Sequence, residues 1–205
     1  ALPPERDHYP QFPARVTAVT DLTPAFRRVT ITAPEISDVA LMGADEYVGL
    51  FMPPPGQGLQ MPDYTGLNPR STLSRIPEAS RPDLRWYTVR EHRAALAEID
   101  IDIVSSGHDG PGARWIKRVK PGDPVGLRFQ TAPYGGAPDV GHHVLIADET
   151  GLPGVLGILS AHAADPGRRF SVIVEVPSED HVLPGTREAG ITVVCRGGDD
   201  PGSAL

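Results

Sequence analysis

A short run in the middle of the chain places guanidinium, aromatic and hydroxyl side chains next to one another: Arg85-Trp86-Tyr87-Thr88-Val89-Arg90. A flavin site needs all three, because a guanidinium neutralises the pyrophosphate, a flat ring lies against the isoalloxazine and a hydroxyl bonds its N5 edge. Side chains alternate along a strand, so Arg85 and Tyr87 share one face and Thr88 points to the other. A bulge or a strand end would bring Thr88 back to the ring. The alternative interpretation is a half-buried edge strand with a surface arginine.

A glycine-rich turn over residues 107–112 follows one predicted strand later and leads into Ala113-Arg114-Trp115. Backbone N–H groups at a helix start attract phosphate, and glycines allow the phosphate to approach closely. Such turns most often only reverse the chain, so this one gains weight from its position after the first run.

Other reactive side chains form no recognisable site. Asp148 and Glu149 could act as paired carboxylates, but we favour a strand-to-helix loop, where the helix dipole stabilises acidic side chains. His142 and His143 are adjacent, so their rings point apart on a strand, and the seven histidines show no metal-ligand spacing. We therefore predict no metal site. Cys195 ends an apolar run and is predicted to be a buried thiol.

The composition is that of a globular chain: 205 residues, of which 40% are hydrophobic, suffice for one large domain or two small ones. The 22 glycines and 23 prolines favour turns and short strands over a helical bundle. A net charge of -7 argues against a nucleic-acid binder, although the arginines between Leu67 and Arg93 would suit an anionic ligand. A single cysteine fits a reducing cytoplasm, and we expect neither a signal peptide nor a membrane span.

The first part of the chain predicts an antiparallel barrel, because apolar and polar residues alternate in short segments that end at turn residues. The expected strands are a hairpin over 15–32 and single strands over 47–52, 84–90, 98–104 and 124–129. A short helix is expected over 113–119, and residues 56–80 are expected to be mostly irregular.

The pattern changes in the last part of the chain. Strands are expected over 143–147, 170–176 and 191–195, with a helix over 151–164 between the first two. A strand–helix–strand order predicts a parallel sheet. We place the boundary in a glycine- and proline-rich linker, which divides the chain into domains of residues 1–138 and 139–205. The second unit is thin for an open α/β domain, so we expect the natural chain to continue.

The motifs, taken in order, resemble the siderophore-interacting protein family, whose members are ferric-siderophore reductases related to ferredoxin–NADP reductases. The resemblance rests on Arg85 to Arg90, Asp102-Ile103-Val104, Gly110 to Trp115, Pro121-Gly122-Asp123 and Asp148 to Pro153. It implies a β-barrel plus α/β fold class, in which a six-stranded antiparallel FAD-binding barrel precedes a nucleotide-binding-like α/β domain. That second, NAD(P)-binding-like domain is only partial within these 205 residues.

The resemblance also implies which residues bind the FAD cofactor. Arg85, Tyr87 and Thr88 would hold the pyrophosphate, the ring and the N5 edge, which makes Thr88 the catalytic side chain. The other cofactor-binding residues would be Val104, the helix-start residues Gly112, Ala113 and Trp115, and Thr150 near the flavin. Ser106 departs from the family, which often has a histidine before the glycine of the turn, and Gly151 replaces the usual alanine.

The implied reaction is FAD-dependent reduction of the Fe(III) in a ferric siderophore, which releases Fe(II). NADH, NADPH or a ferredoxin-like protein would supply the electrons, and Arg70, Arg75 and Arg90 would attract the anionic complex. One alternative is a flavin reductase with another acceptor. A second is a non-catalytic siderophore-binding or regulatory module of a larger chain, such as one fused to a transporter.

Overall fold

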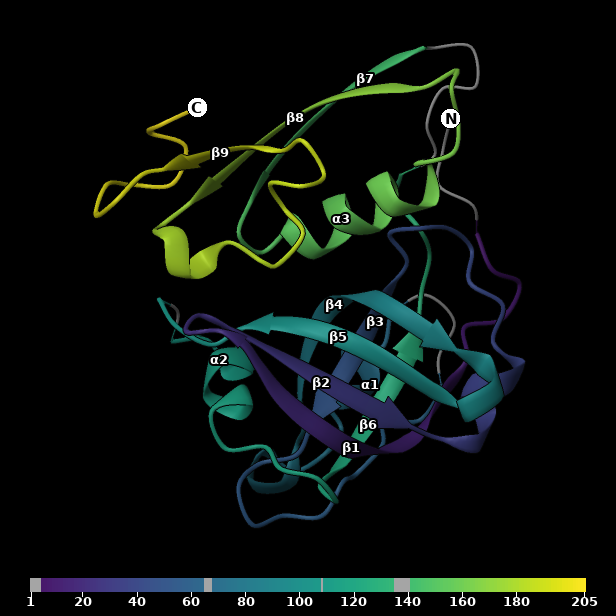
Figure 1. Ribbon diagram of the computed structural model, residues 1–205. Helices are drawn as coiled ribbons and strands as arrows, with labels where there is room; N and C mark the ends of the chain where they lie inside the picture. Colours follow the sequence, from purple (N-terminus) through teal and green to yellow (C-terminus); the bar gives the residue numbers. More distant parts are fainter. Residues whose placement is uncertain (1–4, 65–67, 108, 135–140) are drawn as a thin grey trace.

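The computed structural model describes residues 5–64, 68–107, 109–134 and 141–205, which form two stacked units (Figure 1). A closed barrel forms the first unit, and a three-stranded sheet with one long helix forms the second. The helix lies between the sheet and the barrel (Figure 1). This arrangement confirms the predicted fold class.

Antiparallel strands close the barrel in the order β1-β2-β5-β4-β3-β6. Their bounds are β1 Gln11–Thr23, β2 Phe26–Thr32, β3 Tyr47–Met52, β4 Asp83–Arg93, β5 Glu98–Val104 and β6 Pro124–Phe129. The predicted hairpin and strands are all present, and β3, β5 and β6 have the predicted bounds. Alternate residues fill the interior with aliphatic side chains such as Ile31, Leu50 and Ile101, which are fully buried.

Short helical segments connect the strands. They are η1 Pro34–Asp38, α1 Arg70–Leu73, η2 Glu78–Ser80, η3 Ala94–Leu96 and α2 Pro111–Ile116. Helix α2 begins two residues before the predicted start, because Pro111 has its φ preset for the first helical turn and lacks only an N–H that would be unpaired there. Residues 56–80 are otherwise irregular where described, as expected.

Strand β5 is buried on both faces, although its isoleucines alternate with acidic residues. Its acidic residues Asp100 and Asp102 are only 5% exposed. Arginines from the neighbouring strands neutralise them: Arg93 bonds Asp100 at 2.7 and 2.8 Å, and Arg28 bonds Asp102 at 2.7 and 2.9 Å. Paired hydrogen bonds of this kind offset the loss of water around a buried carboxylate.

The second unit has a parallel sheet of order β7-β8-β9, which confirms the predicted strand–helix–strand pattern. Its elements are β7 His142–Asp148, α3 Leu152–Ala161, β8 Arg169–Val176, η4 Glu179–His181 and β9 Thr192–Cys195. The prediction of a buried thiol at Cys195 is wrong, because β9 is an edge strand and its last residue is exposed. The predicted linker at 135–138 lies outside the described residues. None of the helices in the described ranges is long and apolar enough to cross a membrane.

Close packing joins the two units. Phe26 and Val104 of the barrel belong to the same buried apolar cluster as Leu152 and Val155 of α3. Helix α3 also approaches the barrel through Gly157, where a Cβ atom would lie 2.5 Å from the carbonyl oxygen of Ala44. The absence of a side chain at this position therefore sets how closely α3 lies against the barrel.

We expect Gly157→Ala to lower the free energy of unfolding by about 1–2 kcal/mol, since overpacking outweighs the ~1 kcal/mol that alanine gains over glycine in a helix. Urea denaturation would measure the change. Gly154→Ala in the same helix is the matched control, because its Cβ would have no neighbour closer than 3.4 Å. Equal stability of the two variants would show that the contact at Gly157 does not limit the approach of α3.

Candidate functional site

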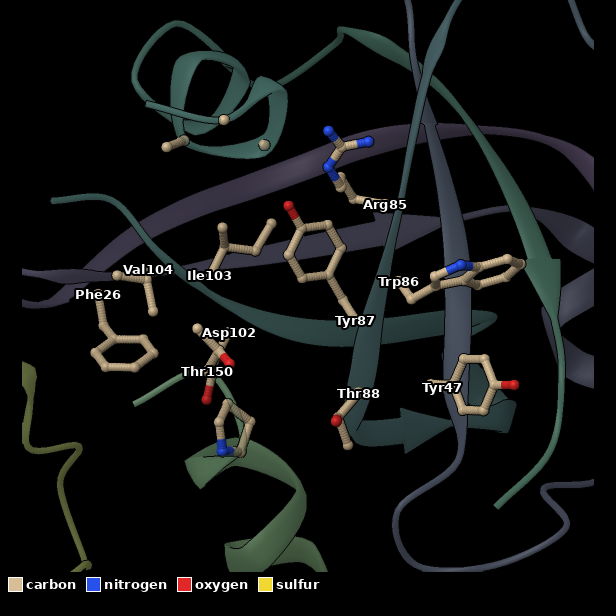
Figure 2. A pocket seen from close by; sticks show the side chains of 14 residues that line it. Phe26, Tyr47, Arg85, Trp86, Tyr87, Thr88, Asp102, Ile103, Val104 and Thr150 are labelled. Carbon is tan, nitrogen blue, oxygen red and sulfur yellow. The ribbon is translucent and has the colours of Figure 1, made fainter. Parts of the chain in front are cut away.

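A cavity of about 390 Å³ opens where β4, β5, the start of α2 and the start of α3 meet (Figure 2). All but one of the predicted cofactor-binding residues line it: Arg85, Tyr87, Thr88, Val104, Gly112, Ala113 and Thr150. These residues come from four separate elements, so the barrel and the second unit build the cavity together.

Strand β4 supplies the predicted run, and its two faces serve different parts of the cavity. Figure 2 shows Arg85 and Tyr87 directed toward the short helix, with Trp86 and Tyr47 on the other side of the strand. Thr88 of β4 pairs with Tyr47 of β3, and both residues line the cavity. The register of β4 with β3 is regular through Tyr87 and Thr88, and a register shift against β5 follows only between Val89 and Glu91. The bulge therefore lies beyond Thr88 and does not turn it to the face of Tyr87.

The hydroxyl of Tyr87 lies against the start of α2. A Cβ atom at Gly112 would lie 1.9 Å from this oxygen, so only glycine leaves room for the tyrosine. Burial raises the pKa of Tyr87 to about 12, which keeps the phenol neutral at physiological pH. Tyr87 therefore offers the cavity a flat, uncharged ring rather than a base.

Arg85 brings a positive charge to the same place. Its side chain is exposed, its Cγ would lie 3.8 Å from a Cβ at Gly112, and its Nη1 donates to the carbonyl of Leu84 at 2.7 Å. Within the described ranges, no carboxylate forms an ion pair with it. A guanidinium beside backbone N–H groups at a helix start is an arrangement that binds phosphate oxygens.

Strand β5 forms the facing wall with Asp102, Ile103 and Val104. Asp102 is neutralised by Arg28 and also lies 3.4 Å from Arg90, so this wall adds no net negative charge. The pairing removes Arg90 from the group expected to attract an anionic partner. Arg70 and Arg75 are exposed, but neither lines the cavity.

Thr150 reaches the cavity from the loop before α3. Its backbone N and its Oγ1 both donate to Oδ1 of Asp148, at 2.8 and 2.7 Å, and the N–H of Gly151 adds a third bond at 3.0 Å. Glu149 is buried and accepts two hydrogen bonds of 3.0 Å from Arg196. The favoured interpretation of Asp148 and Glu149 as a structural loop is thus confirmed.

Trp115 is the predicted cofactor residue that the structure places elsewhere. Its side chain is 2% exposed and packs into the barrel core, because the α2 face that carries it turns inward. Sequence reasoning in turn missed several lining residues: Phe26, Tyr47, Trp86, Asp102, Ile103, Gly110 and Pro153. Most of these lay inside the motifs quoted above, whereas Phe26 and Tyr47 gave no local signal.

An imidazole lies beside Ser106, where the family often has a histidine. It belongs to His181 of η4, whose Nε2 is 3.3 Å from the Ser106 hydroxyl and whose Nδ1 is 3.1 Å from the Ser178 hydroxyl. His181 is buried, so it fixes the contact between the barrel loop and the second unit.

The residues present fit a flavin. The cavity combines a flat ring at Tyr87, the guanidinium of Arg85, a hydroxyl at Thr88 and a space that Gly112 leaves open. Within the described part of the chain, no group of three or more His, Cys, Asp or Glu side chains converges.

Comparison with family models agrees with this geometry. The model for the siderophore-interacting FAD-binding domain matches residues 15–135, and the model for the siderophore-interacting protein matches residues 140–205. This chain belongs to the siderophore-interacting protein family. The family confirms the resemblance inferred from the ordered motifs, and it places an FAD-binding domain on the barrel.

Individual relatives are similar over part of their length. The chain is 32% identical over 127 residues to the uncharacterized protein Rv2895c of Mycobacterium tuberculosis. The matched segment covers 62% of this chain and 45% of Rv2895c. The chain is 29% identical over 133 residues to the ferric vibriobactin reductase ViuB of Vibrio cholerae, 64% of this chain and 47% of ViuB. The chain therefore spans less than half of these relatives.

Two further likenesses concern a longer protein and a solved structure. The mycobactin import ATP-binding/permease protein IrtA of Mycolicibacterium smegmatis is 23% identical over 179 residues, which is 86% of this chain and 17% of IrtA. A siderophore utilization protein from T. fusca superimposes with a TM-score of 0.74 at 26% identity, covering 98% of this chain and 75% of that one.

We expect Gly112→Ala to weaken FAD binding by about tenfold, because the new methyl group displaces the Tyr87 hydroxyl and tilts its ring. Equilibrium titration of the apoprotein with FAD, followed by flavin fluorescence, would measure the affinity. Adding Tyr87→Phe removes the oxygen that the methyl group meets, so the double variant should bind better than Gly112→Ala alone. Failure of this rescue would contradict the proposed clash.

We expect Arg196→Met to lower the free energy of unfolding by about 3–5 kcal/mol at neutral pH, since it removes the two hydrogen bonds that the Arg196 guanidinium donates to the buried Glu149 carboxylate. Although burial alone raises it, the hydrogen bonds from Arg196 hold the pKa of Glu149 below its usual value. The stability from this pair is therefore present at neutral pH and is lost as pH falls through the lowered pKa. In the variant, acid neutralises Glu149, so the difference between the two proteins should shrink as pH falls. Urea midpoints near pH 7 and pH 4 would test this, and a difference independent of pH would contradict it.

Proposed function

We propose that this protein is an FAD-dependent reductase that delivers electrons to Fe(III) held by a siderophore. The observation that carries the proposal is the cavity that unites Arg85, Tyr87 and Thr88 with the starts of α2 and α3. Membership of the family and the similarity to ViuB, a protein named as a ferric vibriobactin reductase, point to the same chemistry.

In this proposal, each wall of the cavity binds one part of the cofactor. Arg85 and the backbone at Gly112 and Ala113 hold the pyrophosphate, and the Tyr87 ring lies against the isoalloxazine. The Thr88 hydroxyl bonds the N5 edge, and Val104 and Thr150 border the ring from β5 and from the loop before α3. Bound FAD supplies the ability to accept a hydride and release electrons singly.

The ferric complex approaches the exposed edge of this site. Reduction weakens the complex, because Fe(II) is a poorer partner than Fe(III) for hard anionic oxygen ligands. NADH or NADPH, or a ferredoxin-like protein, would supply the electrons. In this assignment, residues 1–138 form the FAD-binding domain and residues 139–205 form part of an NAD(P)-binding-like domain.

A second candidate function is that of a module within a longer chain that imports siderophores. The similarity to IrtA, which is named as an import ATP-binding/permease protein, favours this candidate. Such a module would bind the siderophore without reducing its iron, or would reduce it as part of the transporter.

The visible absorption spectrum of the purified protein is the test of the proposed function. Stoichiometric FAD, together with Fe(II) formation from a ferric siderophore in the presence of an Fe(II)-specific chelator, would support it. A protein that neither contains nor binds FAD would overturn it, and retained siderophore binding would then favour the module. Faster reduction of a small organic acceptor than of the ferric siderophore would indicate another flavin reductase.

We expect Arg85→Ala to weaken FAD binding by about 10–100-fold, since a charge-assisted hydrogen bond contributes about 1.5–3 kcal/mol. Arg85→Lys should lose less, because it keeps the charge but not the forked geometry. Titration with FAD would measure both affinities. Arg75→Ala is the matched control, because Arg75 is exposed and lies outside the cavity. Equal losses in Arg85→Ala and Arg75→Ala would contradict a specific role for Arg85.

A further inference from the structure

A second cavity adjoins the candidate flavin site. It measures about 410 Å³ and lies between the barrel and the second unit, under β7 and α3. Thr88 and Tyr47 line both cavities, so the Thr88 hydroxyl stands at the wall that separates them. Of the described residues around the second cavity, Asp45 carries the single charge, and most of the others are apolar or glycine.

The carboxylate of Asp45 is incompletely bonded. Its Oδ2 accepts a hydrogen bond of 2.9 Å from the backbone N–H of Tyr134. Its Oδ1 is buried and has no hydrogen-bond partner among the described residues. Burial raises the pKa of Asp45, and its hydrogen bonds only partly offset this effect. An incompletely bonded buried carboxylate is unfavourable when charged, and such groups are suited to taking up a proton.

Helix α3 leaves the space between Asp45 and Thr88 open. A Cβ atom at Gly154 would lie 3.4 Å from Oγ1 of Thr88 and 4.0 Å from Cβ of Asp45. Both groups therefore border the same point of α3, at a position that has no side chain. Both residues line the second cavity, so a proton would pass between the Thr88 hydroxyl and the Asp45 carboxylate through water in that cavity.

The other charged or titratable groups around Asp45 already have partners. Glu46 pairs with Arg6, Arg90 lies beside Asp102, and the Tyr134 hydroxyl bonds Nδ1 of His143 on β7 at 2.9 Å. The residues of α3 that face the cavity carry no titratable side chain, and the Tyr47 phenol has its pKa raised by burial. Asp45 is thus the group on this side of Thr88 that is best placed to exchange a proton.

We infer that Asp45 is the proton acceptor that serves Thr88, taking up the proton released at the flavin edge during oxidation and returning it during reduction. The inference rests on the proposed function. The balance is one proton for two electrons: FAD bound in its anionic reduced form would supply two electrons, one to each of two ferric ions, which would become Fe(II). The released proton passes from N5 along the Thr88 hydroxyl to the Asp45 carboxylate, which becomes a neutral acid, and then to solvent.

Asp45→Asn tests this role, because the amide keeps an acceptor for the Tyr134 N–H but cannot take up a proton. Reduced protein would be mixed with Fe(III)-EDTA from about pH 5 to pH 9, and flavin oxidation would be followed by absorbance. In the wild type, the rate should rise with pH as the Asp45 carboxylate forms. In Asp45→Asn, the rate of flavin oxidation should no longer rise with pH, and at neutral pH it should be about 10–100-fold lower than in the wild type. Glu78→Gln is the control, because Glu78 is exposed and lines neither cavity.

A second measurement needs neither cofactor nor turnover. Infrared difference spectra of the apoprotein, wild type minus Asp45→Asn, should show one carboxylic-acid C=O band that forms at a higher pH than the bands of the other carboxyls, because burial raises the pKa of Asp45. The same band should appear in the difference between Thr88→Val and Asp45→Asn. In Thr88→Val, too, the rate of flavin oxidation should no longer rise with pH. This variant removes the hydroxyl that connects the flavin edge to Asp45 but keeps the Asp45 carboxyl group.

The outcomes separate this inference from the proposed function. If Asp45→Asn binds FAD and reduces Fe(III)-EDTA with the wild-type pH profile, the proton-acceptor role is overturned and the reductase stands. If the wild type binds no FAD, both fail. If the wild type binds FAD but does not reduce ferric siderophores, the proposed acceptor is wrong, and the pH dependence with Fe(III)-EDTA still decides the role of Asp45.

Discussion

The hydroxyl of Tyr87 occupies the space that a side chain at position 112 would need, and this contact brings β4 against the start of α2. The candidate site depends on that approach. Arg85 lies two residues earlier on the same face of β4, so the contact also carries its guanidinium to the helix start. A cation, a flat ring and the backbone at a helix start thereby meet in one cavity, although the chain between them is more than twenty residues long.

Charge neutralisation in the barrel wall complements this contact. Asp100 and Asp102 would place two negative charges on a strand that borders the cavity, but Arg93, Arg28 and Arg90 pair with them. Burial raises the pKa of Asp100, but the hydrogen bonds from Arg93 and Thr30 and the charges of Arg93 and Arg28 together lower it, so the pairing persists as ions. Among the described residues, Arg85 forms no ion pair with a carboxylate, so its charge is available to an anionic ligand.

The second unit helps to form the candidate site. Phe26 and Val104 line the cavity and also belong to the apolar cluster that holds α3 in place. The glycines of α3 let the helix approach close to β4, which encloses Thr88 between two cavities. The lining of the candidate cavity and the packing of the two units therefore share the same residues, and a change at the interface reaches the cavity.

The sequence by itself determined the local features of this protein. Side-chain alternation and turn residues depend only on neighbours in the chain, so β3, β5 and β6 were predicted with their observed bounds. The motif of Arg85, Tyr87 and Thr88 could be recognised because its chemistry lies within four residues. Tertiary structure decided what depends on distant partners: barrel closure buried Asp100 and Asp102, the edge position of β9 exposed Cys195, and the inward face of α2 took Trp115 away from the cavity. Periodicity shows which side chains share a face, but only the packing of elements decides what each face meets.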